Sequence, residues 1–212
     1  MQLTIFGATG RIGAHVVGQA LQAGHDVTAV VRDGSPFVLR HPRLEVVSVP
    51  RLDDPRPLAP AVAGRDAAIS AVGPRRRRDA GVAAPATRGI LGALEAAGLR
   101  RFLAVSAVPV GRSPVGDSFA NRRILFPLIR AVLRDVYADL AEMEHDIAMS
   151  ATDWTVIRPP YLTDRPLTGA YRIAIGGNVP RGRSIGRAEV AHALLAMLDD
   201  PATIKQAVGL AV

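Results

Sequence analysis

The sequence predicts a doubly wound parallel α/β sheet, and three observations carry that prediction. Short apolar runs alternate with helical patterns along most of the 212-residue chain, as expected for successive strand–helix–strand units. A glycine-rich turn joins the first strand pattern to the first helix pattern. Proline and glycine concentrate at 107–117 and 158–186, after strands, where the loops of such sheets bind ligands.

The first half of the chain carries the clearest alternation. An apolar run at 2–6 precedes a helix at 11–23, in which Ile12, Val16 and Ala20 recur at the spacing of one helix face. Apolar and β-branched runs then predict strands at 27–31, 44–49 and 66–71, with a helix at 56–63.

The second half continues in the same order. We expect helices at 84–97, at 120–149 with a break at Pro127, and at 187–199, and strands at 101–105 and 153–157. The segments AYRIAIG and AVGLAV are expected to form short extra strands that flank the last helix. No repeat or long linker interrupts the pattern, so one domain over 1–212 is expected, with substrate-side loops at 107–123 and 158–186.

Composition excludes several classes of protein. The chain has no cysteine, which removes disulfides, thiolate nucleophiles and thiolate metal sites. The histidines are scattered without metal-ligand spacing, so no metal site is expected. The amino terminus lacks the features of a signal peptide, and no segment is long and apolar enough to span a bilayer. We therefore expect a cytoplasmic, soluble protein without a membrane partner.

The net charge of +7 comes almost entirely from arginine, since Lys205 is the only lysine. Excess arginine is a feature of nucleic-acid-binding proteins. Aromatic residues make up only 4% of the chain, however, and no basic helix is present, so no nucleic-acid partner is expected. The one cluster, RRRR at 75–78, is either a solvated charge run or a site of attraction for anionic substrates.

Gly7, Gly10 and Gly13 form a Gly-x-x-Gly-x-x-Gly pattern between the first strand and the first helix. In dinucleotide-binding folds the first glycine permits a tight turn, and the second lets backbone amides reach a pyrophosphate. The third lets helix and strand pack closely. The helix amino end then offers unpaired amides and a partial positive charge to the anion. The motif in this context predicts dinucleotide binding.

The end of the second strand indicates which dinucleotide is bound. NAD-binding domains favour an acidic residue there, which accepts from the ribose hydroxyl. Here the position holds Arg32, suited to the additional phosphate of NADP, and Arg11 adds a second cation within the glycine loop. Asp33 follows, but we expect it to leave the strand on the other side of the turn. NADP is favoured, and a solvated Arg32 without a ligand is the alternative.

Proton transfer by a tyrosine–lysine pair four residues apart on one helix is excluded by the sequence. Tyr137 is followed at that spacing by Ala141, and the only lysine is distant. The remaining catalytic candidates are Ser106, at the end of the fifth strand, and Tyr161, after the sixth. Each has a structural alternative: Ser106 as a serine that caps backbone groups, and Tyr161 as a half-buried aromatic after a turn.

The motifs GATGRIG, VVRD, AVAGRDAAISAVG, VSAV and RPPYLTDRPLTGAY together resemble the atypical short-chain dehydrogenases of the NAD(P)H-binding family, in particular the flavin reductase/biliverdin-IXβ reductase group. The resemblance runs over most of the chain. It implies a Rossmann fold and an NADPH-dependent reductase that delivers hydride to a flavin, a quinone-like compound or a linear tetrapyrrole. It also implies an open hydrophobic pocket with little side-chain proton chemistry.

The resemblance further implies a set of cofactor contacts, which follow the motifs along the chain. The expected pyrophosphate contacts are Gly7, Thr9, Gly10, Arg11, Ile12 and Gly13, with Arg32 on the 2′-phosphate. The expected ribose contacts are Val72, Gly73 and Pro74; Ser106 and Ala107 are expected at the nicotinamide, and Pro160, Tyr161 and Leu162 over it.

The chain departs from the reductase pattern in three places. Tyr161 stands where the pattern has histidine, which puts a role of that ring in substrate binding in doubt. Val49 and Pro50 replace a Gly-Asp pair, so an aspartate near the adenine is missing unless Asp53 or Asp54 substitutes for it. The stretch 109–135 is longer than in the reductases. Its apolar side chains are expected in the core, or else in a lid or dimer contact: Ile124, Leu125, Leu128, Ile129 and Val132.

Three functions compete on this evidence. The leading one is the NADPH-dependent reductase, acting as a monomer or homodimer on a small-molecule acceptor. The second is a non-catalytic NADP-binding redox sensor, which is equally compatible with the missing tyrosine–lysine pair. The third, a nucleotide-sugar epimerase, is disfavoured because that branch keeps the pair and adds a larger carboxyl-terminal domain.

Overall fold

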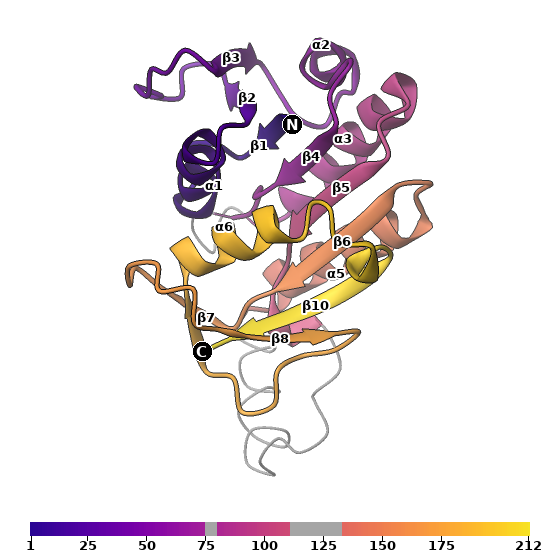
Figure 1. Cartoon of the computed structure of the whole chain (residues 1–212). Coiled ribbons are helices and arrows are strands. Elements are labelled where there is room, and N and C mark those ends of the chain that lie inside the picture. Colours follow the sequence, from indigo (N-terminus) through magenta and orange to yellow (C-terminus); the bar gives the residue numbers. More distant parts are fainter. Residues whose placement is uncertain (75–79, 111–132) are drawn as a thin grey trace.

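An eight-stranded sheet forms the centre of the computed structural model, which describes residues 1–74, 80–110 and 133–212. The strand order is β3-β2-β1-β4-β5-β6-β10-β8, and Figure 1 shows it running from β3 at the top to β8 at the bottom. The pairings between β3 and β10 are parallel, and the edge strand β8 is antiparallel to β10. The predicted fold class is confirmed.

The observed elements of the first half match the expected ones except in one helix. The segment expected as a helix at 56–63 is a 3-10 turn followed by a single α-helical turn, because Pro57 and Pro60 lack the backbone N–H that a regular helix uses. The elements are β1 (Gln2–Phe6), α1 (Arg11–Gln22), β2 (Asp26–Arg32), β3 (Leu44–Val49), the 3-10 turn Arg56–Leu58, α2 (Ala59–Val62) and β4 (Ala67–Ser70).

The second half adds two strands that the sequence pattern does not reveal. β7 and β9 contain three residues each and pair in parallel as a separate small sheet. Of the helix expected at 120–149, α5 is observed; its expected start and Pro127 lie outside the described residues. The elements are α3 (Ala83–Ala97), β5 (Arg101–Val105), the 3-10 turn Val108–Val110, α5 (Arg134–Met149), β6 (Asp153–Arg158), β7 (Tyr161–Thr163), β8 (Arg172–Ile175), β9 (Ser184–Gly186), α6 (Arg187–Ala196), the 3-10 turn Pro201–Thr203 and β10 (Gln206–Ala211).

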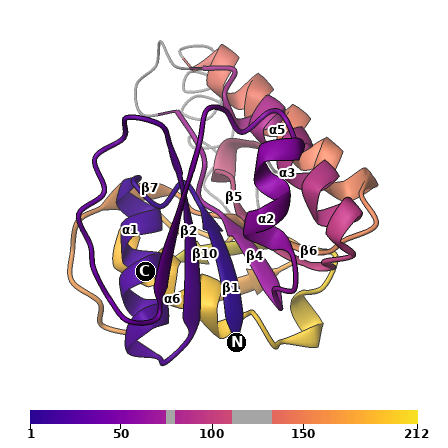
Figure 2. The same ribbon diagram turned by 90° about the horizontal axis from the view of Figure 1, so that it is seen from above.

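Helices cover both faces of the sheet (Figure 2). α1 and α6 pack on one face, and α2, α3 and α5 pack on the other. The central strands are therefore buried on both sides, which explains why they read as continuous apolar runs rather than as alternating ones. Among the described residues, no helix has the length and apolar character needed to cross a bilayer.

The direction of winding reverses between β1 and β4. From β1 the chain proceeds through β2 to β3 on one side, and from β4 through β5 to β6 on the other. The loops after β1 and β4 consequently leave the sheet in opposite directions and open a crevice at its carboxyl edge. The glycine motif lies in this crevice.

Candidate functional site

A cleft of about 660 Å³ opens at the carboxyl edge of the sheet, where the winding reverses. Its walls come from the residues that follow β1, β2, β3 and β4 and from the start of α3. Six residues expected to contact a cofactor line this cleft: Gly7, Thr9, Gly10, Arg32, Val72 and Gly73.

Each of the three glycines has a steric reason for being glycine. Gly7 has a φ of +75°, and a Cβ there would lie 2.8 Å from the carbonyl carbon of Ala71, in the loop after β4. A Cβ on Gly10 would lie 3.1 Å from the carbonyl oxygen of Gly7, to which the Gly10 amide donates at 2.8 Å. A Cβ on Gly13 would lie only 2.1 Å from the same oxygen. The turn is thus closed tightly against both α1 and β4.

The amino end of α1 is open to an anion. Gly10 is its N-cap, no side chain caps it, and its first turn contains no acidic residue. The unpaired amides and the helix dipole together favour a phosphate at this position. The cleft and glycine turn therefore have the form that a dinucleotide pyrophosphate requires.

The amino end of α3 lies at the same cleft but is already occupied by a side chain of the protein. The buried carboxylate of Asp139, on α5, accepts hydrogen bonds from the amides of Gly81 at 3.1 Å and of Ala83 and Ala84 at 2.9 Å each. This contact satisfies the first turn of α3 and fixes that wall of the cleft. Of these two helix starts, only that of α1 is left for a ligand.

Arg32 ends β2 at the cleft and makes no ion pair or side-chain hydrogen bond within residues 1–74, 80–110 and 133–212. Asp33 turns away, as expected. Its amide donates to the Val49 carbonyl at 2.9 Å, and its carboxylate accepts from the Ser48 hydroxyl at 2.5 Å. The charge that this strand end offers to a ligand is therefore positive.

The end of β3 contributes an ion pair that sequence reasoning missed. Arg51 and Asp53 both line the cleft, and the guanidinium donates two hydrogen bonds of 2.5 Å to the carboxylate. These bonds hold the pKa of Asp53 below its usual range. Asp54 instead pairs with Arg56 at 2.8 Å and does not line the cleft. The signal available in the sequence was position, because Arg51 comes two residues after the end of β3, a strand of the parallel sheet.

Ser106 follows β5 and is buried, and its Oγ has no hydrogen-bond partner among the residues described. Its amide donates to the Ile157 carbonyl at 2.8 Å, which ties it to β6. A buried hydroxyl without a partner costs about 1–3 kcal/mol, so such a group is a candidate for contact with a bound molecule. Ala107, beside it, packs into the core that α3 and α5 cover.

The remaining expected residues do not line the cleft. Arg11, at the start of α1, lies 3.7 Å from Asp164, and Ile12 and Gly13 lie on the sheet side of that helix. Tyr161, on β7, is 75% exposed, so it is not the half-buried aromatic that was the alternative for it. Five others lie apart from the cleft lining: Pro74, Ser106, Ala107, Pro160 and Leu162.

The PLTGAY segment is held by a buried carboxylate. Glu189, in the first turn of α6, accepts from the Thr168 amide and hydroxyl at 2.7 Å each and from the Gly169 amide at 3.2 Å. The Tyr171 hydroxyl lies 2.8 Å from Nδ1 of His192, also on α6. This motif therefore anchors the loop before β8 to α6.

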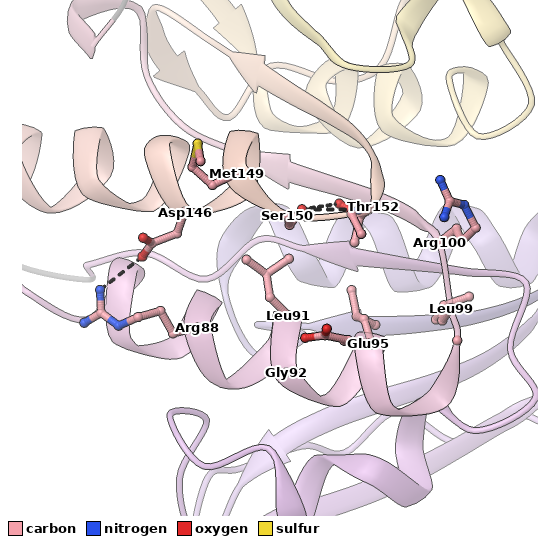
Figure 3. A pocket seen from close by; sticks show the side chains of 13 residues that line it. Arg88, Leu91, Gly92, Glu95, Leu99, Arg100, Asp146, Met149, Ser150 and Thr152 are labelled. Atoms are coloured by element: carbon pink, nitrogen blue, oxygen red, sulfur yellow. Dashed lines mark hydrogen bonds and ion pairs between the residues drawn. The ribbon is translucent and has the colours of Figure 1, made fainter.

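A second hollow, of about 650 Å³, lies between α3 and α5 (Figure 3). Three of its four charged side chains are paired: Arg88 with Glu142 at 2.8 Å, Asp146 with Arg88 at 3.0 Å, and Arg100 with Asp153 at 3.1 Å; Glu95 makes no ion pair with another described residue. The Ser150 and Thr152 hydroxyls lie 2.7 Å apart and bond to each other. The groove reaches the residues that precede β5 and β6, at the amino ends of these strands, and so lies away from the carboxyl edge of the sheet. The cleft at the sheet edge is the candidate site.

A family model described as NAD(P)H-binding matches residues 7–201. The chain belongs to the NAD(P)H-binding family. The cleft fits the cofactor of this family, because Gly7 and Gly13 allow the tight turn between β1 and α1 and α1 presents an uncapped amino end. The protein accordingly has the fold and the cofactor class of the NAD(P)H-dependent oxidoreductases.

Solved structures share the fold over the whole chain. The oxidoreductase ylbE from Lactococcus lactis is 20% identical, with a TM-score of 0.80 over 100% of this chain and 90% of that one. A short-chain dehydrogenase/reductase from Veillonella parvula, solved in complex with NADP, is 19% identical, with a TM-score of 0.79 and coverage of 100% and 94%. ChuY, an anaerobillin reductase from Escherichia coli O157:H7, is 21% identical, with a TM-score of 0.75 and coverage of 100% and 97%.

Proposed function

We propose that this member of the NAD(P)H-binding family is an NADPH-dependent reductase that transfers hydride to a flavin, a quinone-like compound or a linear tetrapyrrole. The observation that carries the proposal is the Ser106 hydroxyl, which is buried and unpartnered among the described residues and follows β5 at the carboxyl edge of the sheet, outside the lining of the cleft. A hydroxyl kept in this state gains a hydrogen bond when a carboxamide or carbonyl arrives.

The preference for NADPH rests on Arg32. An arginine that makes no ion pair or hydrogen bond within the described parts of the chain is available to a phosphate in a charge-assisted hydrogen bond. The acid beside it, Asp33, is turned toward Ser48 and does not line the cleft. A ribose hydroxyl, which an acidic residue would recognise, therefore finds no carboxylate at the end of β2.

NADPH, when bound, supplies the hydride from its nicotinamide ring. In the proposal the protein holds the pyrophosphate at the amino end of α1 and the 2′-phosphate at Arg32, and Ser106 orients the nicotinamide carboxamide or the acceptor carbonyl. In the same proposal Tyr161, an exposed residue of β7 outside the cleft lining, borders the acceptor. Catalysis then depends mainly on binding and orientation of the reactants, without a tyrosine–lysine pair.

The test is an acceptor screen with NADPH and the purified protein. FMN, a benzoquinone and a linear tetrapyrrole are offered in turn, and cofactor oxidation is followed by its absorbance. Oxidation that depends on one of these acceptors, and that is faster with NADPH than with NADH, is the expected result. Tight NADPH binding without turnover on any acceptor contradicts the reductase and supports the non-catalytic sensor.

A further inference from the structure

Arg51 and Arg32 follow or end two neighbouring, paired strands of the sheet. In the parallel pairing of β2 with β3, Arg32 is the partner of Val49, so Arg51 follows two residues beyond that partner. Both arginines line the same cleft. The carboxyl ends of β2 and β3 thus direct two guanidinium groups toward one edge of the site.

Asp53 determines how the Arg51 guanidinium is oriented. Nε and Nη2 of Arg51 donate to Oδ1 and Oδ2 of Asp53 at 2.5 Å each, which fixes the plane of the fork. The side chain of Arg51 stays 63% exposed. The N–H groups that do not face Asp53 are therefore left for a ligand in the cleft.

The backbone that carries this pair is itself fixed against α3. A Cβ on Gly89 would lie 2.1 Å from the carbonyl oxygen of Leu52 and 2.7 Å from the carbonyl carbon of Asp53. One turn further along the helix, a Cβ on Gly92 would lie 3.3 Å from Cβ of Pro55. Two glycines thus let α3 approach the segment 52–55 at backbone distance, and the segment has little freedom to move.

We propose that Arg51 is a second specificity-determining residue, which binds the 2′-phosphate of the cofactor together with Arg32, and that Asp53 is its positioning residue. This inference rests on the proposed preference for NADPH. A phosphate monoester carries a charge of about −1.5 to −2 at neutral pH. A single guanidinium group cannot neutralise that charge.

The test compares two nucleotides that differ only in the phosphate at issue, adenosine 2′,5′-bisphosphate and adenosine 5′-monophosphate. Their binding is measured by calorimetry. Arg51→Gln is expected to weaken binding of the bisphosphate about tenfold and to leave binding of the monophosphate unchanged. Asp53→Asn is expected to lower the ratio of bisphosphate affinity to monophosphate affinity by a smaller factor. Asp53→Glu, which keeps the carboxylate, is expected to restore part of this ratio.

The matched control is Arg56→Gln. Arg56 is also exposed and also paired with an aspartate two residues away, but it does not line the cleft. This variant is expected to bind both nucleotides as the unchanged protein does. A thermal unfolding curve for each variant establishes that a change in binding does not arise from loss of folding.

The possible outcomes separate the inference from the proposed function. Equal losses of both nucleotides in Arg51→Gln mean that the guanidinium stacks on the adenine, which overturns the inference. A preference for the bisphosphate that Arg51→Gln leaves intact also overturns it, while the NADPH preference stands. If the unchanged protein binds both nucleotides equally, the NADPH preference itself is wrong, and the inference falls with it.

Discussion

The cleft at the sheet edge and the groove between α3 and α5 have almost the same volume, about 660 and 650 Å³. They differ in what they leave unsatisfied. In the groove the Arg88 guanidinium and the Ser150 hydroxyl already have partners within the protein. The cleft retains Arg32, uncommitted among the described residues, and the uncapped start of α1. An unpaired cation and an uncapped helix start, and not size, distinguish the candidate site from the groove.

The difference follows from secondary structure. The groove lies along the sides and carboxyl ends of α3 and α5, and backbone hydrogen bonds close the turns that end these helices: the Gly98 amide donates to the Glu95 carbonyl and the Ser150 amide to the Ile147 carbonyl. The cleft lies where strands end and a helix begins, and there the backbone still has amides without partners. Four predictions test whether this contrast holds.

The largest effect is expected from Gly13→Ala. Its Cβ would lie 2.1 Å from the Gly7 carbonyl oxygen, so α1 or the glycine turn has to move. We expect NADPH binding to be lost and the free energy of unfolding to fall by about 3 kcal/mol, measured by urea unfolding and cofactor fluorescence. Gly18→Ala, in the same helix with no atom within 4 Å of its Cβ, is the control and should stabilise the protein by about 1 kcal/mol. Similar behaviour of the two variants would contradict the steric account.

Arg32→Gln and Arg88→Gln compare a cation of the cleft with one of the groove. Arg32→Gln is expected to weaken NADPH binding by about 1.5–3 kcal/mol, the worth of a charge-assisted contact, and to leave NADH binding nearly unchanged. Arg88→Gln removes an exposed ion pair and should change the free energy of unfolding by less than about 1 kcal/mol. It should leave the binding of NADPH and NADH unchanged. Equal losses of NADPH and NADH in Arg32→Gln would show that Arg32 does not recognise the 2′-phosphate.

Ser106→Ala and Ser150→Ala compare an unpartnered hydroxyl with a partnered one. Ser106→Ala removes a buried group without a partner, so stability should hold or rise by about 1 kcal/mol, while acceptor reduction slows. Ser150→Ala loses the bond to the Ile147 carbonyl at 2.7 Å and should cost about 1 kcal/mol with turnover unchanged. Destabilisation by Ser106→Ala would mean that its hydroxyl is paired in solution.

The smallest effect concerns two carboxylates, Asp53 at the cleft and Asp153 next to the groove. Hydrogen bonds from Arg51 and Arg100, respectively, lower the pKa of each. Each pair therefore stabilises the folded protein above the ordinary aspartate pKa, and this contribution is lost as pH falls through the lowered value. Carbon-13 NMR should show both midpoints below the usual range.

A ligand separates the two aspartates. Bound adenosine 2′,5′-bisphosphate adds negative charge at the cleft and should raise the pKa of Asp53, while that of Asp153 stays where it is. Arg100→Gln should return only Asp153 to its usual pKa. An unchanged midpoint for Asp53 in the presence of the nucleotide would place the phosphates away from Arg51.

The order of the elements and the position of the glycine turn were predictable because both follow from local patterns. The strands of the central sheet read as apolar runs, and Gly7, Gly10 and Gly13 mark the strand-to-helix turn. β7 and β9 were not predictable, since a three-residue strand has too few positions to display a period. Their pairing depends on contact between segments far apart in the chain.

The candidate site was predictable in part for the same reason. Arg32 and Ser106 end strands and were found by position, and Arg51 was missed although it also follows a strand. The exposure of Tyr161 and the turn of Asp33 toward Ser48 depend on neighbours that no single stretch of sequence specifies. RRRR at 75–78 and the apolar side chains of the 109–135 stretch lie outside the described residues, so those expectations stay predictions.

The cap that Asp139 places on α3 has a consequence for biosynthesis. Its partner at Ala83 precedes it by 56 residues, so the wall of the cleft that α3 supplies cannot be completed until α5 has left the ribosome. The glycine turn, by contrast, is present in the first stretch of the nascent chain. Cofactor capture is consequently a late event in synthesis, and NADPH added to ribosome-bound chains should be retained only by those that extend beyond α5.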